Sequence, residues 1–258
     1  MSQDLIVLSG GHPFDAPAFA DLLARLDGWH VQHWQHPEAE ARFAAGEADH
    51  ARGLLFYDMP GYTFADGTVA TRPPDPGFVR AFEARLARGQ GAVAMHHALA
   101  GWAAWPDWAA IWGGRFLYQP ERWNGRDVPD SGYRHDVTYT AEVVADHPVT
   151  AGVPQSFTMT DEVYLAEIDE AAITPLVRAR HGFVRDNFWS AAAAVAGRMF
   201  DNAGWDHAPG SDCIAWARTH GTARLVYLQC GDGPQAYANP AFVRLLANAL
   251  DHACKGAT

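Results

Sequence analysis

Apolar runs bounded by turn residues alternate along the chain with segments whose apolar residues recur at helical spacing. A continuous apolar run is typical of a strand buried on both faces, and the helical segments supply crossovers between parallel strands. The sequence therefore predicts an α/β fold, a three-layer sandwich with a mainly parallel sheet. The predicted strands are 5–9, 29–34, 53–58 and 91–95, together with a hairpin-type pair at 213–218 and 223–229.

Helices are predicted where turn residues bracket the helical spacing. Asp75 followed by Pro76 begins a helix that Gly89 ends. Asn239 and Pro240 begin the last helix in the same way, as N-cap and first helical residue. Two further helices are expected, at about 17–27 and at 188–197.

Between about 113 and 180 the alternation gives way to glycines, prolines and β-type residues, as in DVTYTAEVV (136–144). This pattern predicts an irregular insertion that contains antiparallel strands. The 258 residues are long enough to bury one large core, so we expect a single domain spanning 1–258.

The charge balance bears on possible partners. Lys and Arg number 19 against 30 Asp and Glu, which gives a net charge of −11, and no basic run is present. A nucleic acid partner is not expected, because affinity for phosphates comes from clustered cations. The first residues, MSQDLIVLSGG, have no basic region and only a short apolar run, so we expect neither a signal peptide nor a membrane span.

Three residue types stand out in the composition. The three cysteines have no metal-ligand spacing and cannot all pair, which favours a reducing cytoplasm. Thirteen histidines and ten tryptophans favour a small-molecule site, since imidazole transfers protons near neutral pH and indole offers flat apolar faces. The tryptophans also leave open an interface in a homo-oligomer.

Polar residues follow three of the predicted strands. His12 comes shortly after the first strand, Asp58 ends the third, and His96 with His97 follows the fourth. Ligands of open α/β sheets bind at the carboxyl ends of the strands, so we expect these side chains to converge on a pocket. Each also has a structural explanation: His12 as a helix cap, Asp58 as part of a turn, and His97 as a hydrogen-bonded core residue.

His96 occupies the sharp strand-to-helix turn at which α/β hydrolases and amidotransferases carry a nucleophile. Neither Cys nor Ser is present there, so an acyl-enzyme of the usual type is not expected. Imidazole at this turn favours general acid-base chemistry or metal ligation.

Four motifs, in this order, resemble the ThuA-like trehalose-utilisation family: SGGHPFD, GAVAMHHALAGWAAWPDWAAIWGGRF, DHPVTAGVPQSFTMTDEVYL and VYLQCGDGPQAYANPAFVRLLANAL. The resemblance spans nearly the whole chain. It implies a class I glutamine-amidotransferase-like (flavodoxin-like) α/β fold without the amidotransferase Cys-His-Glu triad. It also implies a role in sugar catabolism, particularly of disaccharides and their keto derivatives.

The same resemblance implies which residues belong to the pocket, namely His12, His96, Asp161, Glu162 and Tyr164. The chain departs from the family at one position. Many members have a Gly-His pair after the last core strand, whereas this chain has Gly231 and Asp232. Asp232 could replace a histidine as an oxygen ligand to a metal, but it is a poor proton donor at neutral pH.

Adjacent side chains on an extended segment point to opposite sides, so only one of Asp161 and Glu162 should face the pocket. We favour Glu162, because Tyr164 would then point the same way. A carboxylate near His96 would raise the pKa of the histidine, and burial would lower it. Alternatively, Glu162 only anchors the insertion to the core.

Three more residues complete the expected site. Trp102 and Trp105 lie just after the histidine turn and are expected to wall the pocket and stack on a sugar ring, whereas Trp108 and Trp112 fit an ordinary core stripe. His135, in the insertion, is expected to cover the pocket as part of a lid.

The leading hypothesis is a cytoplasmic enzyme of sugar catabolism. It would act on a sugar, disaccharide or keto-sugar, with His96 and Glu162 as the acid-base pair, by hydrolysis, elimination or isomerisation. One alternative is a divalent-metal-dependent hydrolase with zinc or manganese held by His12, His96, Glu162 and Asp232. Another is a non-catalytic sugar-binding or assembly module. The residues alone do not identify a cofactor, a metal, or the sugar.

Overall fold

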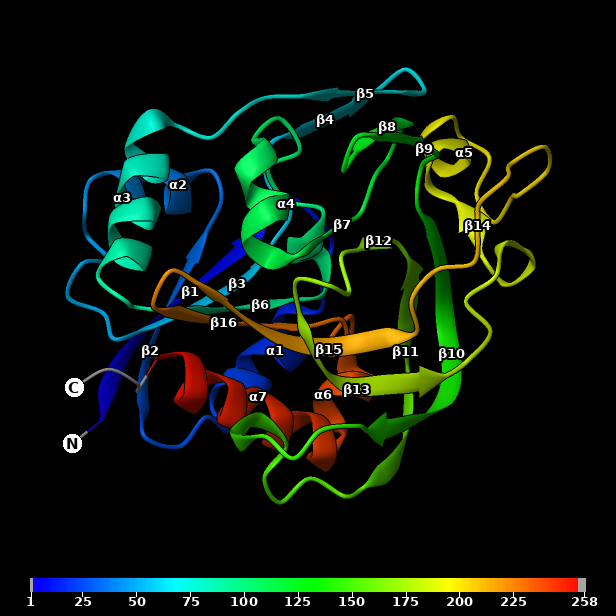
Figure 1. Ribbon diagram of the computed structural model, residues 1–258. Helices are drawn as coiled ribbons and strands as arrows, with labels where there is room; N and C mark the ends of the chain where they lie inside the picture. Colours follow the sequence, from blue (N-terminus) through cyan, green and yellow to red (C-terminus); the bar gives the residue numbers. More distant parts are fainter. Residues whose placement is uncertain (1, 255–258) are drawn as a thin grey trace.

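The computed structural model describes residues 2–254 and contains a central sheet with one parallel half (Figure 1). The strands of the parallel half, in spatial order, are β2 (Trp29–Gln35), β1 (Gln3–Gly10), β3 (Gly53–Asp58), β6 (Ala92–Met95) and β16 (Ala223–Leu228). β1, β3 and β6 are buried at almost every position, as their continuous apolar runs predict.

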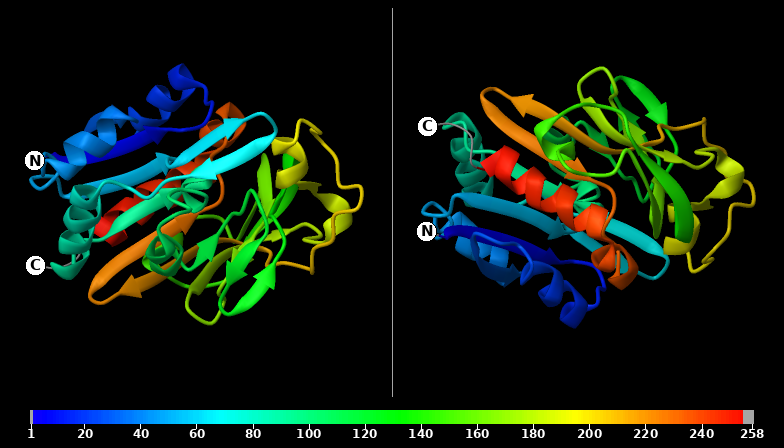
Figure 2. Two further views of the ribbon diagram at one scale, coloured as in Figure 1. Left: turned by 90° about the horizontal axis from the view of Figure 1, so that it is seen from above. Right: turned by 90° about the horizontal axis from the view of Figure 1, so that it is seen from below.

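The other half of the sheet is antiparallel. It continues from β16 through β15 (Cys213–His220), β13 (Thr174–Arg180), β10 (Gly132–Val143) and β11 (Ser156–Leu165), and β14 (Trp189–Ser190) pairs with β10. The α/β prediction is confirmed, but the sheet is mixed rather than mainly parallel. The reason is that strands of the expected insertion extend the central sheet through β15, on the side away from β2 (Figure 2).

Helices cover the parallel half on both faces (Figure 1). One face carries α1 (Ala16–Leu23), α6 (Pro234–Ala238) and α7 (Pro240–Cys254), and the other carries α2 (Glu38–Ala44), α3 (Pro76–Ala87) and α4 (Pro106–Trp112). Two large apolar clusters fill the spaces between the sheet and the helices. The three-layer arrangement is therefore as predicted.

The helix starts follow the predicted capping chemistry. The Asp75 side chain accepts a hydrogen bond from the Gly77 amide at 2.6 Å, with Pro76 as the first residue of α3. Asn239 does the same for α7, accepting from the Ala241 amide at 3.0 Å. The predicted helix at 188–197 is shorter, α5 (Ala191–Val195), because residues 189–190 form β14 instead.

The remaining elements are short. They are the hairpin β4 (Tyr62–Ala65) and β5 (Thr68–Thr71), the pair β7 (Gly114–Arg115) and β12 (Glu167–Ile168), the hairpin β8 (Glu121–Trp123) and β9 (Arg126–Val128), and the 3₁₀ helices η1 (His96–Leu99), η2 (Pro148–Thr150) and η3 (Arg185–Asn187). Of these, η1 and the β4–β5 hairpin lie next to the candidate site.

The cysteines and tryptophans are mostly buried. All three cysteines are buried and free, and burial raises the pKa of both Cys213 and Cys230 to about 12, which makes them poor nucleophiles. Nine tryptophans are buried and Trp189 is half-buried, so the tryptophans offer little exposed surface for an interface.

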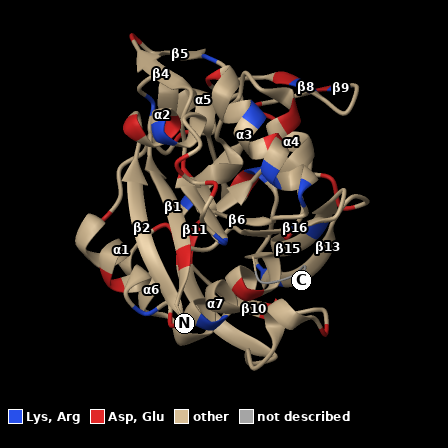
Figure 3. Cartoon of the chain, turned by 90° about the vertical axis from the view of Figure 1, so that its left-hand side faces the viewer, with Lys and Arg blue, Asp and Glu red and all other residues tan. Residues whose placement is uncertain are grey.

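The side of the molecule seen in Figure 3 has acidic and basic positions interspersed. Among residues 2–254, no helix combines the length and the apolar character needed to cross a bilayer.

Candidate functional site

The turn after β6 holds His96 in an unusual backbone conformation. Its φ is +49°, in the left-handed region that non-glycine residues rarely adopt. The Tyr227 hydroxyl donates a hydrogen bond to the His96 carbonyl at 2.8 Å, which helps to hold the turn. Strained backbone of this kind persists where the surrounding structure enforces it, and it clusters at functional sites.

The His96 ring is fully buried and makes hydrogen bonds through both nitrogens. Nδ1 lies 2.6 Å from the Gln229 carbonyl, to which it donates. Nε2 lies 3.0 Å from Glu162 Oε2 and 3.3 Å from Asp232 Oδ1. Burial by itself would lower the pKa of His96, but the interactions with Asp232 and Glu162 outweigh it and raise the pKa well above 6.5. His96 is therefore an imidazolium between two carboxylates.

His97 is held in the opposite charge state. Burial, with the nearby His12 and His96, lowers the pKa of His97 well below 6.5. The Tyr164 hydroxyl, 2.9 Å from His97 Nδ1, donates to this neutral ring. His97 Nε2 lies 3.4 Å from Asp232 Oδ1. The hydrogen bonds from His96 and His97 hold the pKa of Asp232 well below its usual range, against the opposing effect of burial.

The two adjacent carboxylates of β11 point to opposite sides, as expected. Glu162 lies on the same side as Tyr164, and its Oε1 is 3.2 Å from His135 Nδ1. His135 sits at an irregularity of β10, where the register with β11 shifts between Arg134 and Val137. Bulges of this kind redirect side chains and are common next to active sites. His135 thus reaches the site from a sheet strand, not from a lid.

Asp161 was expected to be a pocket residue, and this expectation is wrong. It does not line the cavity, because its carboxylate accepts hydrogen bonds from the amides of Gly231 at 2.6 Å, Asp232 at 3.1 Å and Glu162 at 3.0 Å. Burial raises its pKa to about 7, while His96 and the hydrogen bonds from Gly231 and Asp232 act in the opposite direction. Asp161 therefore positions Asp232 and does not bind in the cavity.

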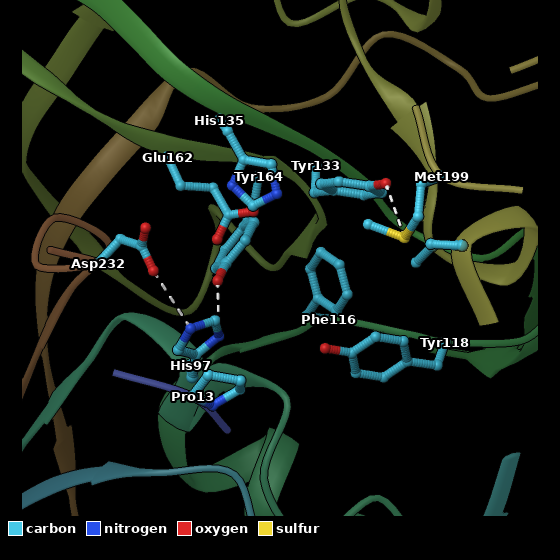
Figure 4. Close-up of a pocket in the computed structure, with 12 residues that line it drawn as sticks. Pro13, His97, Phe116, Tyr118, Tyr133, His135, Glu162, Tyr164, Met199 and Asp232 are labelled. Carbon is cyan, nitrogen blue, oxygen red and sulfur yellow. Dashed lines mark hydrogen bonds and ion pairs between the residues drawn. The ribbon is translucent and has the colours of Figure 1, made fainter. Parts of the chain in front are cut away.

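A cavity of about 450 Å³ lies beside this network (Figure 4). Five of the predicted site residues line it, namely His97, His135, Glu162, Tyr164 and Asp232. The other lining residues are Pro13, Phe116, Tyr118, Tyr133, Ala191, Ala194 and Met199. His96 is not in the wall itself, but its Nε2 contacts three residues that are, Tyr164 at 2.8 Å, Glu162 at 3.0 Å and Asp232 at 3.3 Å.

Three further predicted residues are not in the cavity wall. Asp58 is fully buried and accepts a hydrogen bond from His36 Nε2 at 2.7 Å. Trp102 is fully buried beside Phe78 of α3, with the ring centroids 5.4 Å apart, and Trp105 is 8% exposed. The prediction that these tryptophans wall the pocket is wrong, because the chain after η1 turns into the core under α3.

His12 lies just outside the cavity wall. Its ring is 4.0 Å from that of His97, centroid to centroid, and its Nε2 donates to the Tyr57 carbonyl at 2.9 Å. It supports His97 and is not among the possible metal ligands. Of the residues that the structure describes, His96, His97, Glu162 and Asp232 have ligand atoms within 4.8 Å of one another, so His97 replaces His12 in the expected set.

Sequence reasoning missed the aromatic part of the cavity. Phe116 with Tyr118, and Tyr133 with His135, are two residues apart and so lie on the same side of an extended chain. This spacing could have predicted that the members of each pair face the same side. No pattern in the sequence predicts the place of Met199, because it lies in an irregular loop after α5.

Comparison with known proteins identifies the family. The model of the family ThuA, described as trehalose utilisation, matches residues 16–253. This chain belongs to the ThuA family. A comparison with curated proteins finds no match.

Solved structures share the fold of this chain. A ThuA-like protein of Parabacteroides merdae superposes with a TM-score of 0.68 at 14% identity, covering 100% of this chain and 92% of that one. A ThuA-like protein of Bacteroides uniformis gives 0.59 at 17% identity, covering 96% and 89%. A GMP synthase subunit of Thermoplasma acidophilum gives 0.51 at 8% identity, covering 99% and 96%. The amidotransferase-like fold is thereby confirmed.

Proposed function

We propose that this ThuA-family chain is an enzyme of sugar catabolism that acts on a sugar, disaccharide or keto-sugar by moving a proton at Glu162. The observation that supports this most is the array running from buried His96 through Glu162 to the cavity, with 3.0 Å between His96 Nε2 and Glu162 Oε2. The family's association with trehalose utilisation points to the substrate class.

The roles follow from the geometry. Glu162 presents a carboxylate to the cavity. Its Oε2 lies 3.0 Å from His96 Nε2, and its Oε1 lies 3.2 Å from His135 Nδ1. Beside a ketone, a C–H bond of the substrate would break, the proton would pass to Glu162, and the electron pair would move to the carbonyl oxygen. His135 lines the cavity with its Nδ1 on Glu162, and its other ring nitrogen can bind a substrate oxygen. The imidazolium of His96 keeps Glu162 oriented. Hydrolysis, elimination and isomerisation could each follow this step.

The test is hydrogen exchange in D₂O, followed by ¹H NMR, together with product analysis. Keto and unmodified forms of trehalose and of simple glucosides are incubated with the wild type, with Glu162→Gln, and with Glu83→Gln as a control on the exposed face of α3. We expect exchange next to the ketone, slowed by about 10²- to 10⁴-fold in Glu162→Gln and unchanged in the control. Full activity of Glu162→Gln contradicts the proposal. Binding without turnover or exchange in the wild type favours a sugar-binding module instead.

A second candidate, a divalent metal centre, is favoured by one observation. The four ligand atoms of His96, His97, Glu162 and Asp232 lie within 4.8 Å of one another, and His96 Nδ1 donates a hydrogen bond to the Gln229 carbonyl. Histidine ligands to metals typically make such a second hydrogen bond. Mixed nitrogen and oxygen donors fit zinc or manganese. Two measurements separate the candidates: the metal content of protein purified without added metal, and hydrogen exchange before and after treatment with a chelator. Negligible metal together with unchanged exchange excludes the metal centre.

A further inference from the structure

The cavity has two chemically different ends. Figure 4 shows Asp232, Glu162 and His97 at one end, and Phe116, Tyr118, Tyr133 and Met199 at the other. Ala191 and Ala194 of α5 also line the cavity. Both carboxylates and His97 are therefore at one end, and His135 lies between the two ends, with its Nδ1 3.2 Å from Glu162 Oε1 and its ring 5.2 Å from that of Tyr133.

The few polar atoms at the second end are already engaged. The Tyr118 hydroxyl donates to Met59 Sδ at 3.2 Å. The Tyr133 hydroxyl accepts a hydrogen bond from the Phe200 amide at 3.2 Å and donates to Met199 Sδ at 4.0 Å. Burial raises the pKa of both tyrosines, so both keep their protons. A second sugar ring placed here would lose the hydrogen bonds that its hydroxyls make with water and find few replacements.

The apolar surface continues from this end to the outside. Five large apolar side chains are exposed among residues 2–254, and three of them adjoin the cavity wall. Met199, 52% exposed, is part of the wall itself. Phe64 of the β4–β5 hairpin has its ring 5.1 Å from that of Tyr118, and the Phe200 amide donates to the Tyr133 hydroxyl at 3.2 Å. Exposed apolar groups gathered at one place mark a binding surface.

We infer that the ligand of this cavity is an aryl glycoside or its keto derivative, with the sugar at the Glu162 end and a flat apolar aglycone between Tyr118, Tyr133 and Met199. This inference rests on the proposed function and narrows its substrate class. A volume of about 450 Å³ lies within the range of roughly 300–1,000 Å³ that takes ligands of more than one ring. A disaccharide fits this wall less well than an aryl glycoside, because its second ring is polar.

The experiment measures binding by calorimetry with four kinds of probe: methyl glucosides, phenyl glucosides, trehalose and phenol. The glucosides are used as both anomers, with and without an oxidised ring hydroxyl. We expect the phenyl glucoside to bind about 10- to 100-fold more tightly than the methyl glucoside, the gain expected for burying one aromatic ring. Trehalose should bind no more tightly than the methyl glucoside.

Two variants on the same short helix test the location. Ala194→Phe fills the apolar end and should abolish the preference for phenyl over methyl glucoside. Ala192→Phe is the matched control, since Ala192 is half-buried but is not part of the cavity wall. It should retain the preference.

The outcomes separate this inference from the proposed function. If trehalose binds more tightly than the phenyl glucoside, or if Ala194→Phe keeps the wild-type preference, the aryl glycoside assignment is wrong while a sugar site remains. If no sugar-containing probe binds better than phenol, the proposed function itself fails, and this inference fails with it.

Discussion

Gly11 offers a sharp test of how the loop after β1 supports the site. It precedes His12 and has a φ of +83°, and a Cβ placed there would lie 2.2 Å from the Met59 carbonyl oxygen and 2.6 Å from its carbon. Gly28 has the same φ of +83°, but a Cβ there would have no neighbour within 4 Å. The two glycines therefore share one backbone penalty and differ in steric clash.

The magnitudes follow from that difference. Alanine in the left-handed region costs about 1 kcal/mol relative to glycine, so Gly28→Ala should lower the free energy of unfolding by about that amount. Gly11→Ala pays the same penalty and must also displace the backbone after β3, and overpacking of this kind costs about 1–3 kcal/mol more. We expect Gly11→Ala to be destabilising by about 3 kcal/mol in total, with the displacement transmitted to His12.

Urea unfolding followed by tryptophan fluorescence measures both variants, and equal slopes against urea concentration show that the same transition is compared. If the two variants are destabilised equally, within about 0.5 kcal/mol, the close packing of Gly11 against Met59 does not constrain this loop as we argue.

Two further predictions concern stability. Asp161→Asn places an amide donor where the carboxylate accepts hydrogen bonds from buried backbone amides, so it should lower the free energy of unfolding by about 1–3 kcal/mol. The control Asp21→Asn, on the exposed side of α1, should change this free energy little. Equal effects of the two variants in urea unfolding would contradict the role given to Asp161. Burial, together with the neighbouring His147 and Arg224, lowers the pKa of His252 to about 4, below its unfolded value of about 6.5. The unfolded chain therefore takes up the proton first as the pH falls, and stability is lost progressively between about pH 6.5 and pH 4. His252→Gln should lose less stability than the wild type when urea unfolding is compared at about pH 7 and pH 5, and parallel losses would refute the assignment.

Part of the site was predictable because it depends on neighbours along the chain. The alternation of side chains along β11 separates Glu162 from Asp161 and puts Glu162 on the side of Tyr164. The position of His96 and His97 at the carboxyl end of β6 follows from the buried strand before them. What could not be predicted is which of the two histidines reaches the cavity, since that depends on the left-handed turn at His96.

The α/β class, the helix starts at Asp75 and Asn239, and the strands of the parallel half follow from local pattern, because they depend on apolar spacing and capping within a few residues. Three features do not follow from it: the insertion's strands extend the central sheet, Trp102 lies in the core, and Phe116 and Met199 share one cavity wall. These contacts join segments far apart in the chain, where side-chain packing and not local pattern sets which faces meet.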